Sequence, residues 1–220
     1  KTSDEIDYAV KKKIKQINVE SEEEIQDIVE VLKNKKECIN ISLRVNPDID
    51  ASTHNKISTG RSEDKFGIPL GEIEKIYAKY QNFKNINING LAIHIGSQIT
   101  NIAPFEKAFK QLRSLIKCLK NKSFKIEQLD LGGGIGISYG KNKTISLNLY
   151  RNLISKYFKE FELELLFEPG RFLVGSSGVL LTKIVRIKNN KNNKFLILDC
   201  GMNDLLRPSL YDANHEILPV

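Results

Sequence analysis

Apolar residues follow two different spacings along the first 170 positions. Short apolar runs with the composition of strands are separated by longer segments in which apolar residues recur every three or four positions, as on one face of a helix. We expect strands at 17–20, 39–45, 86–95, 126–131 and 163–168, and helices at 3–16, 21–32, 70–81, 102–120 and 148–161. This alternation predicts an α/β fold with parallel strands and crossover helices.

The pattern changes after Gly178. Residues 179–188 and 195–201 read as two strands around an Asn/Lys-rich turn, and no helical segment lies between them. We therefore expect an α/β domain over 1–177 and the start of a β-rich domain over 178–220. The long polar loop that follows Asn46-Pro47 and contains Gly60 and Gly67 is of the kind that often has a function.

Composition limits the class of protein. The 220 residues are 40% hydrophobic, enough for a full core, yet the chain is short for a complete α/β barrel of about 250 residues. It begins with Lys1 rather than Met, so we expect an interior piece of a longer protein. Without an apolar run of about 18 residues, we expect a soluble cytoplasmic protein that does not span a membrane.

Charge and cysteine content exclude other classes. The net charge of +7 comes mostly from lysines scattered among asparagines, with no basic and aromatic stripe, which argues against nucleic-acid binding. Cys38, Cys118 and Cys200 are odd in number, widely spaced and without a C-x-x-C pair. They predict neither disulfides nor a metal site, and we expect three packed thiols.

Three motifs follow apolar strands at regular intervals: AIHIGSQ (92–98), LDLGGGIG (129–136) and LFEPGR (166–171). About one strand, one helix and two loops separate each from the next. If each polar group lies where its strand ends, all three meet at one rim of a parallel sheet or barrel, where α/β folds bind ligands.

The glycine run 132–134 has two readings. Three residues without Cβ allow backbone N–H groups to close around a phosphate, and the same run also suits a tight structural turn. The dinucleotide fingerprint fails because Ile137 stands where its last Gly is required, and the P-loop fails because Asn142 replaces Ser or Thr. The segment 175–178 lacks the G-x-S-x-G spacing of a serine hydrolase.

The polar side chains of the other two motifs are also ambiguous. His94 is either a packed core residue or a ligand contact at the strand end, and Ser97 adds a hydroxyl at the same rim. Glu168 and Arg171 flank Pro169-Gly170 and form either a local ion pair or a functional couple. A carboxylate buried beside a heteroaromatic nitrogen would hold that nitrogen protonated.

The combined motifs resemble one known family. HIGSQ, LDLGGGIGISY, EPGR and GMNDLLRPSLY, preceded by RVNPDIDASTHNKISTG, are similar in this order to the fold-type III pyridoxal-phosphate decarboxylases, and within them to the diaminopimelate decarboxylases. The resemblance covers nearly the whole chain. It implies a TIM-type (β/α)8 barrel, here incomplete at its N-terminal end, followed by a β-domain. It also implies pyridoxal 5'-phosphate as cofactor, a homodimer, and decarboxylation of meso-2,6-diaminopimelate to L-lysine and CO2 in lysine biosynthesis.

The resemblance also implies roles for individual residues. His94 would stack on the cofactor ring, Ser97 and the glycines Gly132, Gly133 and Gly134 would contact the phosphate, and Glu168 would pair with the pyridine nitrogen. The turn residues Pro169 and Gly170 would lie against the cofactor. Arg171 would bind substrate, and the R-P-x-x-Y pair Arg207 and Tyr211 would hold a substrate carboxylate, which ornithine and lysine lack in their side chains.

Departures from the family leave alternatives open. Its Schiff-base lysine would precede Lys1 and its proton-donating cysteine would follow Val220, so we expect these 220 residues alone to be inactive. A non-catalytic shortened homologue is one alternative, and an ornithine- or arginine-type decarboxylase is another. We assign no role to Arg44, to His215, or to His54 and Lys56 in the long loop.

Overall fold

The computed structural model describes residues 1–50, 60, 65–140 and 144–220. His54 and Lys56 lie outside the described residues. Within these ranges, no helix has the length and apolar character needed to cross a membrane.

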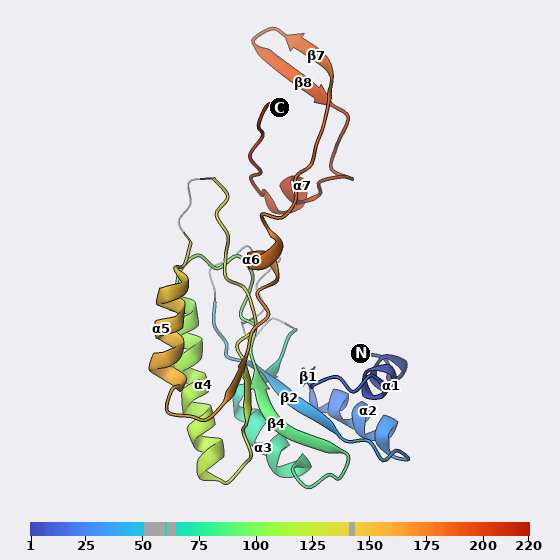
Figure 1. The fold of residues 1–220 in the computed structure, drawn as a ribbon, viewed down its shortest axis with the longest axis vertical. Helices are drawn as coiled ribbons and strands as arrows, with labels where there is room; N and C mark the ends of the chain where they lie inside the picture. The colour runs from blue at the N-terminus through green and yellow to red at the C-terminus, as the bar shows by residue number, and fades with distance from the viewer. Residues whose placement is uncertain (51–59, 61–64, 141–143) are drawn as a thin grey trace.

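A parallel sheet with helices packed along it forms the larger part of the molecule (Figure 1). Its strand order is β1-β2-β4-β5-β6, and a short strand β3 also pairs with β2. The strands are β1 (Ile17–Val19), β2 (Ile39–Asn46), β3 (Ile68–Pro69), β4 (Ile86–Ala92), β5 (Gln128–Asp130) and β6 (Glu164–Leu166). The crossover helices are α2 (Glu22–Leu32), α3 (Leu70–Tyr80), α4 (Ala103–Asn121) and α5 (Leu147–Phe158). The predicted alternation is confirmed, whereas β3 was not foreseen.

The first helix is shorter than its apolar pattern indicated. Helix α1 (Ser3–Lys11) begins with a capping box between the N-cap residue Thr2 and Glu5. It ends before Lys13, whose φ of 53° lies in the left-handed region. The expected extension to residue 16 is therefore wrong, and Ile14 is exposed.

Aromatic side chains fill the space between α4 and α5. The Phe109 ring is fully buried, and its centroid lies 5.9 Å from that of Tyr150 and 5.2 Å from that of Phe158. Phe105 meets Tyr150 edge-on at 5.1 Å. These helices therefore pack on each other as well as on the sheet, which fixes the strands that they connect.

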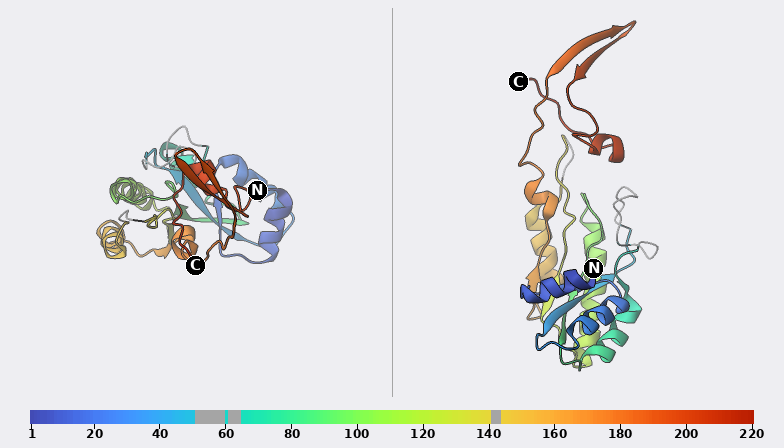
Figure 2. Two further views of the ribbon diagram at one scale, coloured as in Figure 1. Left: turned by 90° about the horizontal axis from the view of Figure 1, so that it is seen from above. Right: turned by 90° about the vertical axis from the view of Figure 1, so that its right-hand side faces the viewer.

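The C-terminal part has a different construction. After α6 (Gly170–Val174), strands β7 (Ile184–Asn190) and β8 (Asn193–Leu198) form an antiparallel hairpin, followed by α7 (Arg207–Tyr211). The hairpin lies at one end of the molecule, well away from the sheet (Figures 1 and 2). The predicted hairpin is present, with its strands at 184–190 and 193–198 rather than 179–188 and 195–201. Neither α6 nor α7 was predicted.

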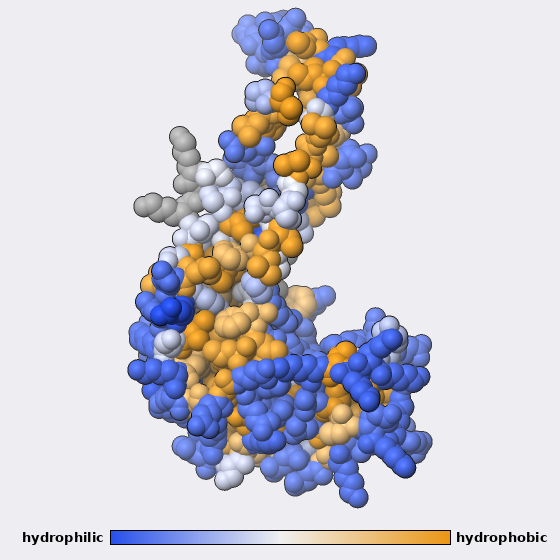
Figure 3. All heavy atoms as spheres, in the orientation of Figure 1, coloured by the Kyte–Doolittle hydropathy of each residue, from blue (hydrophilic) through white to orange (hydrophobic). Residues whose placement is uncertain are grey.

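Apolar side chains are exposed along this hairpin. Figure 3 shows apolar surface on the hairpin and on the segment that joins it to the sheet. Phe195 and Val185, for example, are 45% and 62% exposed. Among the described residues, none after Phe158 is buried.

The cysteines are less buried than expected. Cys38 and Cys118 are exposed and Cys200 is partly exposed, and all three are free thiols. Cys118 lies on the outer face of α4, where its thiol is 3.7 Å from a carboxylate oxygen of Glu74. The prediction of packed thiols is therefore wrong for Cys38 and Cys118.

Candidate functional site

The three motifs lie at the C-terminal ends of neighbouring strands. Strand β4 leads into residues 93–98, β5 into 131–136 and β6 into 167–171, and these three strands are adjacent in the sheet. His94 therefore lies just beyond its strand, which ends at Ala92 rather than at residue 95. The predicted convergence at one rim is present.

Backbone hydrogen bonds connect the three loops. The Ile93 N–H donates to Asp130 O at 2.9 Å, and the Glu168 N–H donates to Gly132 O at 2.8 Å. The Ile99 N–H donates to Gly134 O at 2.8 Å. The glycine loop is thus bonded to the loops on both sides, so the three motifs form one connected structure.

The glycines are required by close backbone contacts. Gly132 and Gly134 have φ values of 63° and 97°, which L side chains rarely adopt. A Cβ at Gly133 would overlap the carbonyl oxygen of Glu168, and one at Gly134 would overlap that of Gly96. Such a loop can bring its backbone against a phosphate at short distance, because no side chain intervenes.

His94 has a defined hydrogen bond and an unusual environment. The Gly133 N–H donates to His94 Nδ1 at 3.3 Å, so this nitrogen acts as the acceptor of a neutral imidazole. Burial and the nearby Arg44 guanidinium lower the pKa of His94, and the carboxylates of Asp130 and Glu20 partly oppose that effect. A neutral ring at the rim suits stacking on an aromatic ligand.

Glu168 belongs to a carboxyl pair. Its side chain is exposed at the rim, contrary to the expectation of a buried carboxylate, and the buried carboxyl of Asp130 lies close enough to affect its charge. Loss of hydration and the nearby Asp130 carboxylate raise the pKa of Glu168, and the Arg44 guanidinium opposes this effect. Sequence analysis missed Asp130, although a carboxylate within an apolar strand is itself a signal.

Arg171 is oriented by Gln98 rather than by Glu168. Arg171 Nη1 donates to Gln98 Oε1 at 3.1 Å, so the alternative of a local Glu168–Arg171 ion pair is not what the structure shows. Gln98 also exchanges two hydrogen bonds with the Ile137 backbone, at 2.6 and 3.2 Å. Gln98 therefore links the first and third motifs through the second.

The remaining predicted residues are less closely gathered. Ser97 is partly exposed in the first loop, Pro169 is the N-cap of α6, and Gly170 is the first residue of that helix. Arg207 and Tyr211 lie on α7, beyond α6 from the sheet (Figure 1), and the Arg207 guanidinium lies over the Tyr211 ring, 5.3 Å from its centroid. The structure thus groups the expected cofactor residues, while it pairs Arg207 and Tyr211 with each other.

Two of the unassigned residues have clear contacts. Arg44 Nη1 is 2.5 Å from Glu20 Oε1, and its guanidinium lies over the Phe66 ring at 5.0 Å. The His215 ring meets Tyr139 edge-on at 5.6 Å, which brings the C-terminal segment against the loop after the glycines. Arg44 therefore forms a salt bridge close enough to His94 and Glu168 to affect both.

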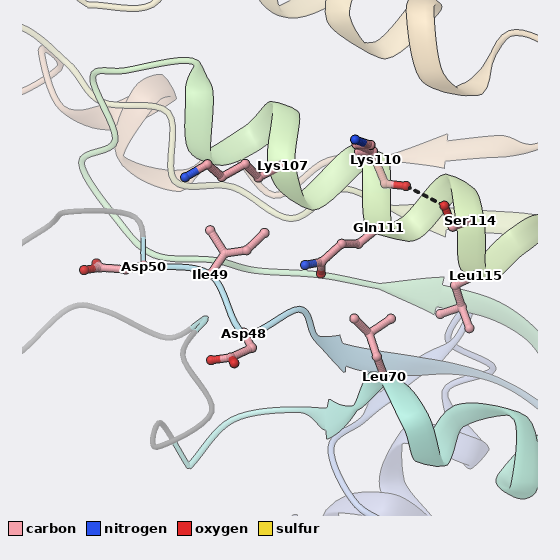
Figure 4. Close-up of a pocket in the computed structure, with 9 residues that line it drawn as sticks. All are labelled: Asp48, Ile49, Asp50, Leu70, Lys107, Lys110, Gln111, Ser114 and Leu115. Atoms are coloured by element: carbon pink, nitrogen blue, oxygen red, sulfur yellow. Dashed lines mark hydrogen bonds between the residues drawn. The ribbon is translucent and has the colours of Figure 1, made fainter.

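Two cavities lie close to this rim. One of about 700 Å³ lies between α4 and the segment after β2, lined in part by Asp48, Lys107 and Gln111 (Figure 4), and contains none of the motif residues. Another, of about 390 Å³, lies behind Gly132 and Gly133 and is almost wholly apolar. An apolar lining does not suit a phosphate, so we place the candidate site on the polar side of the glycine loop.

Comparison with known proteins identifies the family. The sequence profile of the "pyridoxal-dependent decarboxylase, pyridoxal binding domain" matches residues 1–175. The chain belongs to the pyridoxal-dependent decarboxylases. The family expected from the motifs is confirmed, and so are its pyridoxal phosphate cofactor and the α/β barrel class of the fold.

Individual relatives of this decarboxylase chain are similar over its whole length. The diaminopimelate decarboxylases of Zymomonas mobilis and Vibrio cholerae are 43% and 41% identical over 100% of the chain, which corresponds to 53% of each of those proteins. The crystal structure of the Helicobacter pylori diaminopimelate decarboxylase complexed with L-lysine is 37% identical, with a TM-score of 0.94 over 98% of this chain and 54% of that one. The chain thus spans about half the length of the curated relatives it matches.

The residues of the rim fit the pyridoxal phosphate that the family binds. The glycine loop presents bare backbone to the rim, and a Cβ at Gly133 or Gly134 would overlap a carbonyl oxygen of a neighbouring loop. A neutral His94 ring and the Glu168 carboxyl lie on either side of that loop. A phosphate, an aromatic ring and a ring nitrogen each find a chemically suitable partner among them.

Proposed function

We propose that the protein decarboxylates meso-2,6-diaminopimelate to L-lysine and CO2, with these 220 residues supplying most of the cofactor site. The observation that carries the proposal is the convergence of the HIGSQ, GGG and EPGR loops at one rim, in a chain similar along its whole length to diaminopimelate decarboxylases. The lysine bound to the Helicobacter pylori enzyme is the product that this reaction would form.

In this proposal the sheet residues hold the cofactor. The Gly134 N–H and the Ser97 hydroxyl bind its phosphate, and the absence of side chains at Gly132 and Gly133 lets the phosphate approach the backbone. The N–H groups of Gly132 and Gly133 themselves donate to Asp130 and His94. Pro169 and Gly170 pack against the cofactor. His94 stacks on the ring, and Glu168 holds a proton on the ring nitrogen. When bound, pyridoxal phosphate supplies an electron sink for the electron pair left by departing CO2.

Two arginines recognise the substrate in the same proposal. Arg171, oriented by Gln98, faces the rim, and Arg207 and Tyr211 on α7 bind the distal carboxylate. A guanidinium matches a carboxylate through two parallel hydrogen bonds, whereas it would repel the distal ammonium of ornithine or lysine. Arg207 therefore favours diaminopimelate over an ornithine- or arginine-type substrate.

The domain boundary and the assembly belong to the same proposal. We place the barrel domain at 1–177 and the β-domain from 178 onward, in a homodimer. The contrast between the parallel sheet and the exposed antiparallel hairpin supports this division.

The decisive experiment measures CO2 release by the full-length protein. We expect release from meso-diaminopimelate that depends on added pyridoxal phosphate, with little from ornithine, arginine or lysine. Borohydride reduction followed by peptide mass mapping then locates the lysine that carries the cofactor. Release from ornithine alone would assign the protein to another substrate, and absence of both cofactor and turnover would indicate a non-catalytic homologue.

A further inference from the structure

The contact between His215 and Tyr139 has no part in the function proposed above. Asp212, the C-cap of α7, has a left-handed φ of 51°, and the Ala213 N–H donates to Arg207 O at 3.5 Å. The chain therefore changes direction directly after α7. The segment that follows brings the His215 ring edge-on to the Tyr139 ring, with 5.6 Å between the centroids and 79° between the planes.

Packing rather than hydrogen bonding accounts for this contact of His215. Its Nε2 is buried and has no hydrogen-bond partner among the residues that the structure describes. A buried nitrogen without a partner is destabilising, so this atom does not explain why the ring lies here. An edge-on pair of rings, in contrast, is one of the geometries that aromatic side chains favour. The stabilising contact of His215 is therefore the one between the two rings.

Tyr139 belongs to a loop that is held firmly against the sheet. Two residues before it, the Ile137 N–H donates to Gln98 Oε1 at 3.2 Å, and Gln98 Nε2 donates to Ile137 O at 2.6 Å. Gln98 Oε1 also accepts the hydrogen bond from Arg171 Nη1 at 3.1 Å. The same loop thus contacts, at Ile137, the residue that orients Arg171 and, at Tyr139, the segment that follows α7.

We propose that His215 is a positioning residue, which holds Arg207 in place relative to the cofactor site by packing on Tyr139. The inference rests on the proposed function, because it assumes that Arg207 binds the distal carboxylate while the glycine loop binds pyridoxal phosphate. A substrate that reaches both positions binds tightly only if their spacing is set before it arrives. The residues that connect α7 to the sheet, 175–206, cannot set this spacing by packing, because none of them is buried.

The first test measures steady-state kinetics of the full-length protein with pyridoxal phosphate bound. His215→Leu should raise the KM for diaminopimelate roughly 2- to 10-fold, the value of one aromatic contact. The kcat and the affinity for pyridoxal phosphate should not change, because the variant loses binding that substrate and transition state share. Ile217→Ala, in the same segment but 83% exposed, is the matched control and should leave the KM unchanged. An unchanged KM in His215→Leu would overturn the proposal.

The second test asks whether the two rings act together. His215→Phe keeps an aromatic edge and removes the unpartnered nitrogen, so its KM should equal that of the wild type. Tyr139→Leu should raise the KM as much as His215→Leu does, and the double variant should be no worse than either single one. Tyr139→Leu decides the matter if His215→Leu does not fold. Additive losses, or a raised KM in His215→Phe, would contradict a ring contact that positions Arg207.

The third test separates positioning from a general disturbance of the site. The product L-lysine keeps the distal carboxylate of diaminopimelate, whereas 1,5-diaminopentane lacks it. His215→Leu should weaken competitive inhibition by L-lysine roughly 2- to 10-fold and leave inhibition by 1,5-diaminopentane unchanged, because only L-lysine reaches Arg207.

Equal weakening of both inhibitors would show a structural role only and would overturn the proposal. Wild-type turnover without a selective loss in His215→Leu would refute this inference alone. If the wild type neither decarboxylates diaminopimelate nor binds L-lysine, the proposed function fails, and the role of His215 fails with it.

Discussion

The sheet and the C-terminal hairpin place their apolar side chains in opposite environments. The sheet and its helices bury a continuous cluster that runs from Ile6 to Phe158, whereas the hairpin strands expose nearly all of theirs. Local sequence is sufficient for both to form secondary structure. Only the first has enough partners within these residues to form a core, so the two regions should respond differently to the same kind of substitution.

The largest effect is expected from truncating the core. Phe109→Ala should lower the free energy of unfolding by about 3–5 kcal/mol, because the ring is fully buried among Phe105, Tyr150 and Phe158. Phe195→Ala in β8, where the ring is 45% exposed, should change it by less than about 1 kcal/mol. Urea unfolding of the 220-residue chain compares the two. Similar losses would contradict the distinction between the regions.

The next largest effect should separate substrate binding by the C-terminal region from cofactor binding by the sheet. Arg207→Ala should raise the KM for diaminopimelate roughly 10- to 100-fold, because the variant loses a hydrogen bond to a charged carboxylate. The affinity for pyridoxal phosphate should stay unchanged. Steady-state kinetics and cofactor titration of the full-length protein measure both. Arg186→Ala, on the exposed β7 strand, is the matched control. A parallel loss of cofactor affinity would mean that α7 supports the cofactor site.

A substitution in the glycine loop beside the sheet should instead weaken cofactor binding. Gly133→Ala forces a Cβ against the Glu168 carbonyl, which should cost about 1–3 kcal/mol in stability and weaken cofactor binding. Gly71→Ala is the control, because a Cβ there meets no atom within 4 Å and alanine suits the helix. Thermal melting and cofactor titration report the two quantities. Normal cofactor affinity in Gly133→Ala would remove the glycine loop from the phosphate site.

The smallest expected effect is on the pH dependence of stability. A carboxyl whose pKa is raised in the folded state makes that state bind more protons than the unfolded chain, so stability falls as pH rises from the ordinary value of 4.5 to the raised one. Glu168→Gln removes this titration. Its melting temperature should match that of the wild type in acid and exceed it at neutral pH. A constant difference at all pH values would show that the carboxyl is not perturbed.

Sequence predicted the strands and the rim because both depend on local pattern. Apolar runs and strand-end motifs are enough to place His94, Gly132 and Glu168 together. The end of α1 was misjudged because Ile14 fits the helical spacing, yet the left-handed Lys13 breaks the helix before it. Apolar spacing contains no information about such a backbone reversal.

The features that the sequence did not predict depend on contacts between residues far apart in the chain. Gln98 contacts Ile137 and Arg171, and Asn18 contacts Asp130 across 112 positions. Neither residue has a local pattern that points to its partner. The exposure of Cys118 likewise depends on which face of α4 meets the core, and cysteine composition alone suggested the opposite.

The amide of Gln98 has a consequence for how fast an anionic molecule could reach the rim. Because a neutral group holds Arg171 in place, that contact leaves the positive charge of the guanidinium uncompensated, whereas a carboxylate partner would cancel its field. Arg171 then attracts carboxylates over a distance comparable to the Debye length, about 8 Å at physiological ionic strength. The association rate of a dicarboxylate should therefore fall as salt is added, and Gln98→Glu should flatten that dependence.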